Sequence, residues 1–206
     1  HFMLGVIHWE RGELAQARTV MEEDIAIAES VHSLTPLVGT RADLALLYAE
    51  MGDVAHGMEL ATLARATAEK SLPILQSWPH AVQVILALRS GDLRAAREYV
   101  ATLEDYRTVQ RRFGYMPFMW IRVGLAHGEL ALLEGAFAQA ATLMDALYAD
   151  LMASDIWYLR ADVLHLKARA LQAQGSPCAK EACETLAQAR AVAERMRSRR
   201  MLDQIR

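Results

Sequence analysis

Apolar residues recur every three or four positions along most of the chain, and the periodic stretches meet at glycines. RADLALLYAEM precedes Gly52 and VAHGMELATLARATAEK follows it, while IRVGLAHGELALLE and FAQAATLMDALYADL flank Gly135 in the same way. This spacing places apolar side chains on one face of an α-helix. Val and Ile are too scattered to form the runs that indicate strands. The pattern therefore predicts an all-α protein made of helical hairpins that turn at glycines.

The turn glycines occur at nearly constant intervals of 40, 39, 44 and 40 residues, at Gly12, Gly52, Gly91, Gly135 and Gly175. A regular period of this size indicates stacked supersecondary units. Glycine can adopt the left-handed conformation that ends a helix. We predict a single repeat array over residues 1–206, with units at approximately 1–34, 35–76, 77–114, 115–154 and 155–197 and the start of a further helix at 198–206.

A small residue lies five positions after each glycine: Ala17, Gly57, Ala96, Ala140 and, after a two-residue insertion, Ala182. Such a residue lets two helices approach closely. Two boundaries have local signals as well. Ser154-Asp155 is expected to cap the first helix of the fifth unit. Gly114 and Pro117 predict a loop within the longest interval.

The glycine, the small residue and the apolar and small residues nine and twelve positions after the glycine resemble the tetratricopeptide repeat (TPR). Leu44-Ala45 and Tyr48 stand where that family places Leu-Gly and Tyr. The period departs from the family, being about 40 residues where the TPR has about 34. The resemblance covers essentially the whole chain. It implies a right-handed α-α superhelix, a TPR-like solenoid of about five helical hairpins, whose concave groove is lined by the first helix of each unit.

The resemblance also implies which residues face this groove. Those expected to contact a partner are Trp9, Glu50, Trp78, Arg89, Arg122, Glu129, Asp162, His165 and Arg169. The expected lining is apolar in its middle, has mixed charges, and lacks the concentration of Lys, Arg and Asn that would clamp a terminal carboxylate. An amphipathic segment with an apolar stripe would fit it better. The alternative is that the apolar members pack only against neighbouring helices.

Charge and composition argue against two kinds of partner. The net charge is −3 with His neutral, whereas nucleic acids and anionic membranes attract surfaces rich in Lys and Arg. No apolar run reaches the length of about 20 residues that spans a bilayer. Cys178 and Cys183 are five positions apart and cannot form a disulfide within one helix. Reduced thiols are expected, which suits a cytoplasmic protein.

Catalytic motifs are missing from the sequence. It contains no phosphate-binding glycine loop, no nucleophile elbow and no Cys pair with zinc spacing. Asp162 and His165 share a helix face and could ligate a metal, but further ligands are not evident, so a local hydrogen-bonded pair is favoured. We therefore expect no catalytic residue, no metal and no cofactor. An all-helical enzyme would need turnover that depends on His127, Asp162 or His165.

The C-terminal stretch contains a basic cluster of Arg195, Arg197, Arg199 and Arg200. We interpret it as cations at a helix C-terminus followed by a solvated linker; the alternative is a site for a phosphate or an acidic partner. Neither end of the array has the polar capping unit that repeat proteins need, so we expect a part of a longer chain. LRADVLHLKARALQAQG is similar to the repeat tails of bacterial signalling ATPases, which carry nucleotide-cyclase or DNA-binding output domains.

Two functions follow from these observations. The first is a non-catalytic protein–protein interaction scaffold, the regulatory module of a larger signalling protein, which binds a segment of a partner protein or of another domain of the same chain in the groove. The second is a small-molecule effector sensor of a signalling ATPase or transcriptional regulator.

Overall fold

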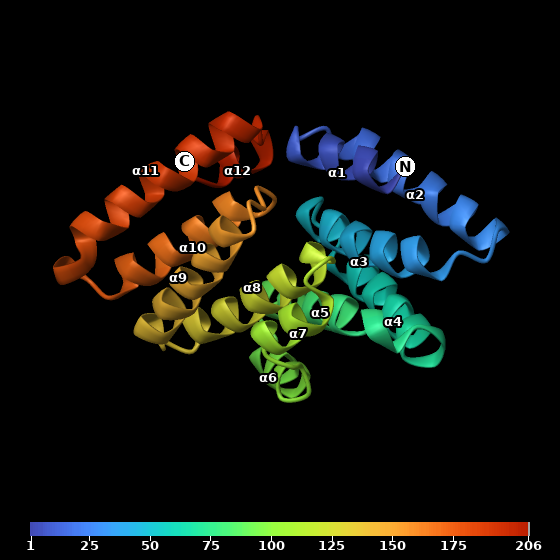
Figure 1. Cartoon of the computed structure of the whole chain (residues 1–206), viewed down its shortest axis with the longest axis horizontal. Helices are drawn as coiled ribbons and strands as arrows, with labels where there is room; N and C mark the ends of the chain where they lie inside the picture. Colours follow the sequence, from blue (N-terminus) through green and yellow to red (C-terminus); the bar gives the residue numbers. More distant parts are fainter. Residues whose placement is uncertain (206) are drawn as a thin grey trace.

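The computed structural model describes residues 1–205, and in this range it contains α-helices, two 3-10 turns and short connections, with no strand. The α-helices are α1 (Phe2–Glu10), α2 (Leu14–Ser30), α3 (Leu34–Glu50), α4 (Val54–Ser71), α5 (Ser77–Arg89), α6 (Leu93–Val100), α7 (Tyr106–Phe113), α8 (Pro117–Leu133), α9 (Phe137–Ala153), α10 (Arg160–Ala173), α11 (Ala179–Met196) and α12 (Arg199–Gln204). Successive helices pack as the pairs α1–α2, α3–α4, α5–α6, α8–α9 and α10–α11 (Figure 1). The prediction of an all-α repeat array is confirmed.

Each pair turns at one of the five glycines of the repeat, whose φ angles lie between 75° and 93°. At Gly52 the backbone N–H donates to the carbonyl of Ala49, and the N–H of Asp53 donates to the carbonyl of Tyr48. These bonds satisfy carbonyls at the end of α3, in a conformation that favours glycine. The carboxylate of Asp53 then accepts the N–H of His56 and caps α4. The same pair of backbone bonds recurs at Gly12, Gly91 and Gly135.

The small residues after the turns lie where the paired helices touch. Ala17, Ala96, Ala140 and Ala182 are fully buried. At Gly57 a Cβ atom would lie 2.5 Å from the carbonyl oxygen of Ala45 in the preceding helix. One hydrophobic cluster extends from Val6 in α1 to Ala182 in α11. Each pair therefore buries its apolar face against its neighbours, and the array shares one continuous core.

The third unit departs from the predicted hairpin. The sequence predicts one helix from Leu93 to Tyr106, but α6 ends at Val100 and a separate helix, α7, begins at Tyr106. The carboxylate of Asp105 accepts the backbone N–H of Thr108 and caps α7. This extra helix accounts for the interval of 44 residues. The predicted loop shrinks to the short connection before Pro117, where α8 begins.

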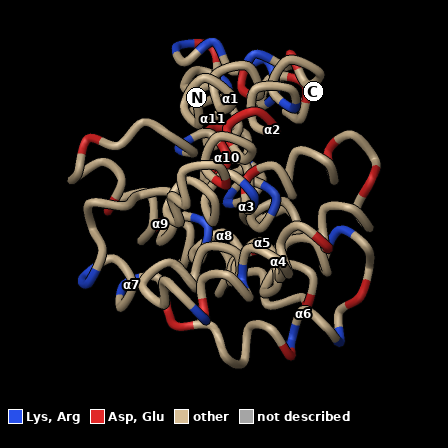
Figure 2. The backbone as a smooth tube through the Cα atoms, turned by 90° about the vertical axis from the view of Figure 1, so that its right-hand side faces the viewer, with Lys and Arg blue, Asp and Glu red and all other residues tan. Residues whose placement is uncertain are grey.

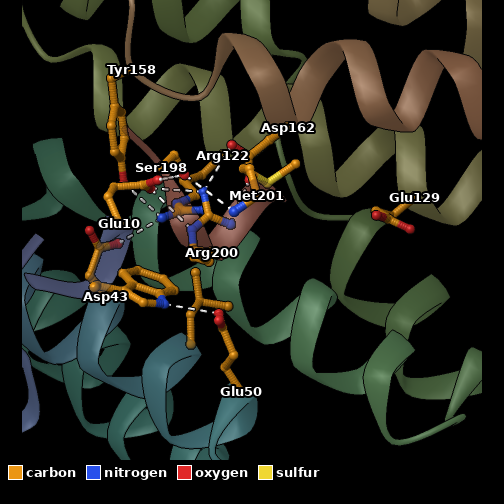
Figure 3. A network of polar contacts seen from close by, with 12 residues as sticks. Glu10, Asp43, Glu50, Arg122, Glu129, Tyr158, Asp162, Ser198, Arg200 and Met201 are labelled. Atoms are coloured by element: carbon orange, nitrogen blue, oxygen red, sulfur yellow. Dashed lines mark hydrogen bonds and ion pairs between the residues drawn. The ribbon is translucent and has the colours of Figure 1, made fainter. Parts of the chain in front are cut away.

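The expected cap of the fifth unit was also wrong. α9 ends at Ala153, Asp155 has a left-handed φ of 48°, and α10 begins only at Arg160. Leu159 precedes α10 with a φ of 61° and makes no side-chain cap bond. The connection is therefore longer and more irregular than a capped turn, and it places the hydroxyl of Tyr158 beside Arg122 (Figure 3).

The array curves until its first and last helices meet, so that α1 and α12 lie side by side (Figure 1). Charged residues of both signs are spread over the outer helices and the centre (Figure 2). The interpretation of the basic end as a solvated linker was wrong for Arg200, which is only 7% exposed and is paired with acids from α1 and α10. The curvature brings these acids to it from positions far away in the sequence. None of the described helices is long and apolar enough to cross a membrane.

We expect the folded protein to lose stability in mild acid because of His80 in α5. Burial, and next the charge of Arg65, lower the pKa of His80 from 6.5 to about 4. Between these values the unfolded chain binds a proton that the folded chain does not, so stability falls as the pH falls. We expect this residue to remove about 1.5 kcal/mol of unfolding free energy between pH 6.5 and about pH 5. Urea unfolding over this pH range should show a steeper loss in the wild type than in His80→Gln; equal slopes would contradict the prediction.

Candidate functional site

The first helices of the units and α12 surround a central cavity of about 520 Å³ on the concave side of the array. The lining residues follow helical spacing, as Arg122, Leu125, Glu129 and Leu133 do on α8. Eight of the nine residues predicted for the groove line this cavity: Trp9, Glu50, Arg89, Arg122, Glu129, Asp162, His165 and Arg169. Leu46, Ile85, Leu88, Leu125 and Leu166 supply apolar wall between them. The cavity therefore combines an apolar wall with charged groups of both signs.

Trp78, the ninth predicted residue, does not line the cavity. Its side chain is 4% exposed, stacks on Phe118 with ring centroids 5.7 Å apart, and meets Phe2 edge to face. Its indole N–H donates to Asp43 at 3.2 Å. Trp78 lies in the first turn of α5, about two turns before Ile85, where this aromatic cluster covers it. It supports the site from the core instead of facing a ligand.

Arg200 joins the two ends of the array, as Figure 3 shows. Its guanidinium donates to Glu10 of α1 at 2.8 and 3.1 Å and to Asp162 of α10 at 2.9 and 3.0 Å. Ser198 donates a further hydrogen bond to Glu10. Burial alone would lower the pKa of Arg200, but Asp162 and Glu10 hold it well above its usual value. We call Glu10, Asp162, Ser198 and Arg200 the closing contact.

Trp9 contacts three charged residues of the cavity wall. Its indole N–H donates to Glu50 at 2.9 Å. The guanidinium carbons of Arg122 and Arg200 lie over its ring, 5.5 and 5.4 Å from the centroid. These are distances at which a cation is attracted to an aromatic face. Trp9 therefore fixes the positions of two cavity arginines and one cavity acid.

Arg122 connects the cavity with a buried polar group in the core. It donates to the hydroxyl of Tyr158 at 2.9 Å and lies 3.6 Å from the carboxylate of Asp43. Burial raises the pKa of Asp43, while Arg122 and the bond from Trp78 partly offset this effect. One oxygen of Asp43 and the Nε of Arg122 have no hydrogen-bond partner among residues 1–205. The hydrogen-bonding groups of the pair are therefore only partly satisfied. Each buried charge is compensated mainly by the charge of the other residue.

The remaining charged and titratable residues of the cavity are Arg89, Glu129, His165 and Arg169. Arg169 donates to both oxygens of Glu129, at 3.0 and 3.3 Å. Arg89 makes one long hydrogen bond, 3.5 Å, to the carbonyl of Leu46. Burial lowers the pKa of His165, and the charge of Arg169 adds to this effect. His165 is therefore a neutral donor or acceptor at neutral pH.

These groups can hold a ligand by charge, hydrogen bonds and apolar contact. In the part of the chain that the structure describes, no group of three or more His, Cys, Asp or Glu could hold a metal ion. Asp162, considered above as a metal ligand beside His165, is bonded to Arg200. The sequence did not identify Arg200, Met201 and Gln204 as lining residues. A clue was present in the apolar Met201 next to the basic cluster, but the curvature that places it in the cavity has no local signal.

Comparison with known proteins supports the fold. No protein-family model matches the sequence, and no curated protein matches it. Two crystal structures of a kinesin light chain-like protein of Podosopora anserina with nearly identical TPR-like repeats are similar to the chain. One, a single-site variant, has a TM-score of 0.55 and 21% identity, and covers 96% of this chain and 95% of its own. The other has a TM-score of 0.53 and 20% identity over 93% and 92%. The chain therefore has the fold of a TPR-like repeat protein.

Proposed function

We propose that this chain is a non-catalytic interaction module that binds a segment of a partner protein in the central cavity. The observation that carries the proposal is the convergence of five first helices and α12 on one cavity with apolar and charged walls. Concave surfaces of stacked helical repeats are extended binding surfaces in general. Apolar wall and charges of both signs suit an amphipathic segment.

The size of the cavity restricts the segment. A volume of about 520 Å³ lies within the range of about 300–1,000 Å³ that is typical of small-ligand sites. A helix with its side chains is about 10–12 Å wide and would not enter such a space. The expected occupant is therefore a few residues of a loop or a chain end, with the rest of the partner outside.

The same volume favours a second candidate, a small-molecule effector. An effector molecule of this size would fill the cavity by itself. The array would then act as the sensor of that effector. A thermal-shift screen of short amphipathic peptides and of metabolites distinguishes the two candidates, because a ligand that binds only the folded chain raises its melting temperature. A hit among the peptides supports the first candidate, and a hit among the metabolites supports the second.

The variant Leu133→Trp tests whether either kind of ligand binds in the central cavity. Leu133 lines the cavity and is 47% exposed, so a larger side chain can enter the cavity without disturbing the core. We expect Leu133→Trp to weaken the binding of the best hit at least about tenfold, which is about 1.4 kcal/mol. Leu63→Trp is the matched control, because Leu63 is 48% exposed on α4 and does not line the cavity. Calorimetric titration that finds equal affinity for both variants would place the ligand elsewhere.

The proposed setting is a larger cytoplasmic signalling protein. Its support is the similarity of LRADVLHLKARALQAQG in α10 to the repeat tails of bacterial signalling ATPases. In such a protein, the ligand of the cavity would act on an attached output domain. A gene that encodes neither a nucleotide-binding domain nor an output domain beside this array would contradict the setting while leaving the binding proposal intact.

A further inference from the structure

Four arginines and three acids line the central cavity, and most of them form ion pairs. The pairs in the cavity wall and directly behind it are Arg200–Asp162, Arg169–Glu129 and Arg122–Asp43. Two lining charges are left over, one of each sign, because Glu50 and Arg89 are in no ion pair among residues 1–205. These two side chains are therefore the charged groups of the cavity that are available to pair with a ligand.

Glu50 and Arg89 occupy the same position on neighbouring helices. Each lies two residues before the turn glycine of its unit, Gly52 or Gly91, at the end of α3 or α5. α3 and α5 pack against each other, and the axes of packed helices lie about 8–10 Å apart. The acid and the base therefore face the cavity side by side without bonding to each other.

One uncharged partner orients each of the two groups. Glu50 accepts the indole N–H of Trp9 on one carboxylate oxygen, at 2.9 Å (Figure 3). Arg89 donates one long hydrogen bond, 3.5 Å, to the carbonyl of Leu46. Within residues 1–205 the second oxygen of Glu50 and most N–H groups of Arg89 have no other bond. They can therefore bind an ammonium group and a carboxylate, respectively, at little cost in reorganisation.

The cavity is accessible from the side on which these groups lie. Arg89 is exposed at the end of α5, and Leu133, at the corresponding end of α8, is 47% exposed. Arg122 lies about three turns earlier in α8 and is only 5% exposed. A ligand that enters the cavity from the exposed end therefore meets Glu50 and Arg89 before it reaches the buried charges.

Apolar wall lies next to both charged groups. Leu46 precedes Glu50 by four residues, and Ile85 precedes Arg89 by the same interval, so each apolar residue shares a helix face with the charge. Both residues line the cavity, as does Leu88. The site thus presents an acid, a base and an apolar surface within one small space.

We propose that the ligand of the central cavity is a free α-amino acid with an apolar side chain. Its ammonium group binds Glu50, its carboxylate binds Arg89, and its side chain lies on the apolar wall. The proposal rests on the proposed function, because it takes the cavity as the binding site, and it gives the chemical class of the small-molecule effector. A segment inside a partner chain carries neither terminal charge, so the two candidate ligands lead to opposite expectations.

Matched ligands test which charges are recognised. The probes are L-leucine, L-methionine and L-phenylalanine, each with the amine and the carboxylic acid that lack one of its two charges, such as 2-phenylethylamine and 3-phenylpropanoate. We expect at least one amino acid to raise the melting temperature. In calorimetric titration its two analogues should bind at least about tenfold more weakly, because each leaves one charge of the site unpaired.

Two outcomes would overturn the proposal. One is that an analogue binds as tightly as its amino acid, and the other is that none of the amino acids binds. If a peptide or another metabolite binds instead and Leu133→Trp weakens it, the amino acid is excluded while the central cavity remains the binding site.

Two substitutions assign the charges to the residues. Glu50→Gln keeps an acceptor for the indole of Trp9, and Arg89→Met keeps a long side chain and loses one long hydrogen bond, so both variants should fold. We expect each to weaken the binding of the best amino acid at least about tenfold. Glu50→Gln should not weaken the carboxylic acid analogue, and Arg89→Met should not weaken the amine analogue.

The matched controls are Glu59→Gln and Arg94→Met, because both residues are exposed on other helices and neither lines the cavity. They should leave all affinities unchanged. If Glu50→Gln and Arg89→Met weaken the amino acid and both analogues to the same degree, the two residues only support the shape of the cavity and the proposed recognition is wrong.

Discussion

Asp43→Asn is expected to lower the free energy of unfolding by about 3–5 kcal/mol, because it leaves a buried arginine without its counter-charge. Asp43 is completely buried, and Arg122 is 5% exposed at 3.6 Å from it. Arg122 cannot lose its proton in response, since an arginine side chain stays charged in proteins. Its closest remaining partners, the hydroxyl of Tyr158 and the ring of Trp9, are uncharged, and Asp162, which also attracts it, is bonded to Arg200. Urea unfolding at neutral pH measures the loss.

Replacing Arg122, the other member of the pair, should lower the free energy of unfolding by less. In Arg122→Met the uncompensated group is Asp43, whose pKa burial already raises, and it can take up a proton and become neutral. We therefore expect Asp43→Asn to be more destabilising than Arg122→Met, and the double variant to recover part of the loss. Arg94→Met is the control for an ion pair on the surface, because Arg94 pairs with Glu98 in α6 and both side chains are exposed, and such pairs contribute about 0–1 kcal/mol. If Asp43→Asn lowers the free energy of unfolding no more than Arg94→Met does, the buried pair stabilises the protein no more than a surface ion pair.

The parts of this fold that follow from sequence are those with local causes. The turn at Gly52 requires a left-handed φ, which favours glycine. The end of α3 is therefore set by residues next to it in the sequence. Ala17 and Ala140 are small because two adjacent helices touch there. Helix α7 was missed although Asp105 is a good cap, because the helix predicted from Leu93 to Tyr106 extends past this cap and the chain around Gly114 was predicted to be a loop.

The residues of the candidate site also fall into those that the sequence predicts and those that it does not. Glu129 and Arg169 could be placed in the groove because each lies a fixed number of residues before a turn glycine. The distance from the turn glycine could not exclude Trp78 from the groove. This distance predicts which face of the helix a residue occupies, but it does not predict which neighbouring side chains cover the end of the helix. Arg200 could not be found at all. Its place depends on the summed rotation of all five pairs, a small angle per unit that no short stretch of sequence encodes.

The largest effect expected from packing alone is at Gly57, where α4 lies against α3. A Cβ atom at this position would meet the carbonyl oxygen of Ala45 at 2.5 Å. A backbone atom within a helix cannot move aside as the end of a flexible side chain can, so the two helices must separate. We expect Gly57→Val to reduce the unfolding free energy by about 3 kcal/mol, at the upper end for overpacked cores, measured by urea unfolding.

Gly57→Ala should show the same conflict in a milder form, because alanine gains about 1 kcal/mol of helix propensity over glycine and so masks part of the clash. Ala66→Val provides the control for a β-branched residue, since Ala66 is exposed in the same helix, and it should cost less than about 1 kcal/mol. The separation forced at Gly57 acts on the contact between the two helices of one unit. Because every unit contributes to the curvature, we also expect Gly57→Val to accelerate hydrogen exchange in α12, whose contact with α1 requires the ring to close. Equal stability of Gly57→Val and Ala66→Val would show that α3 and α4 tolerate a wider spacing than the structure has.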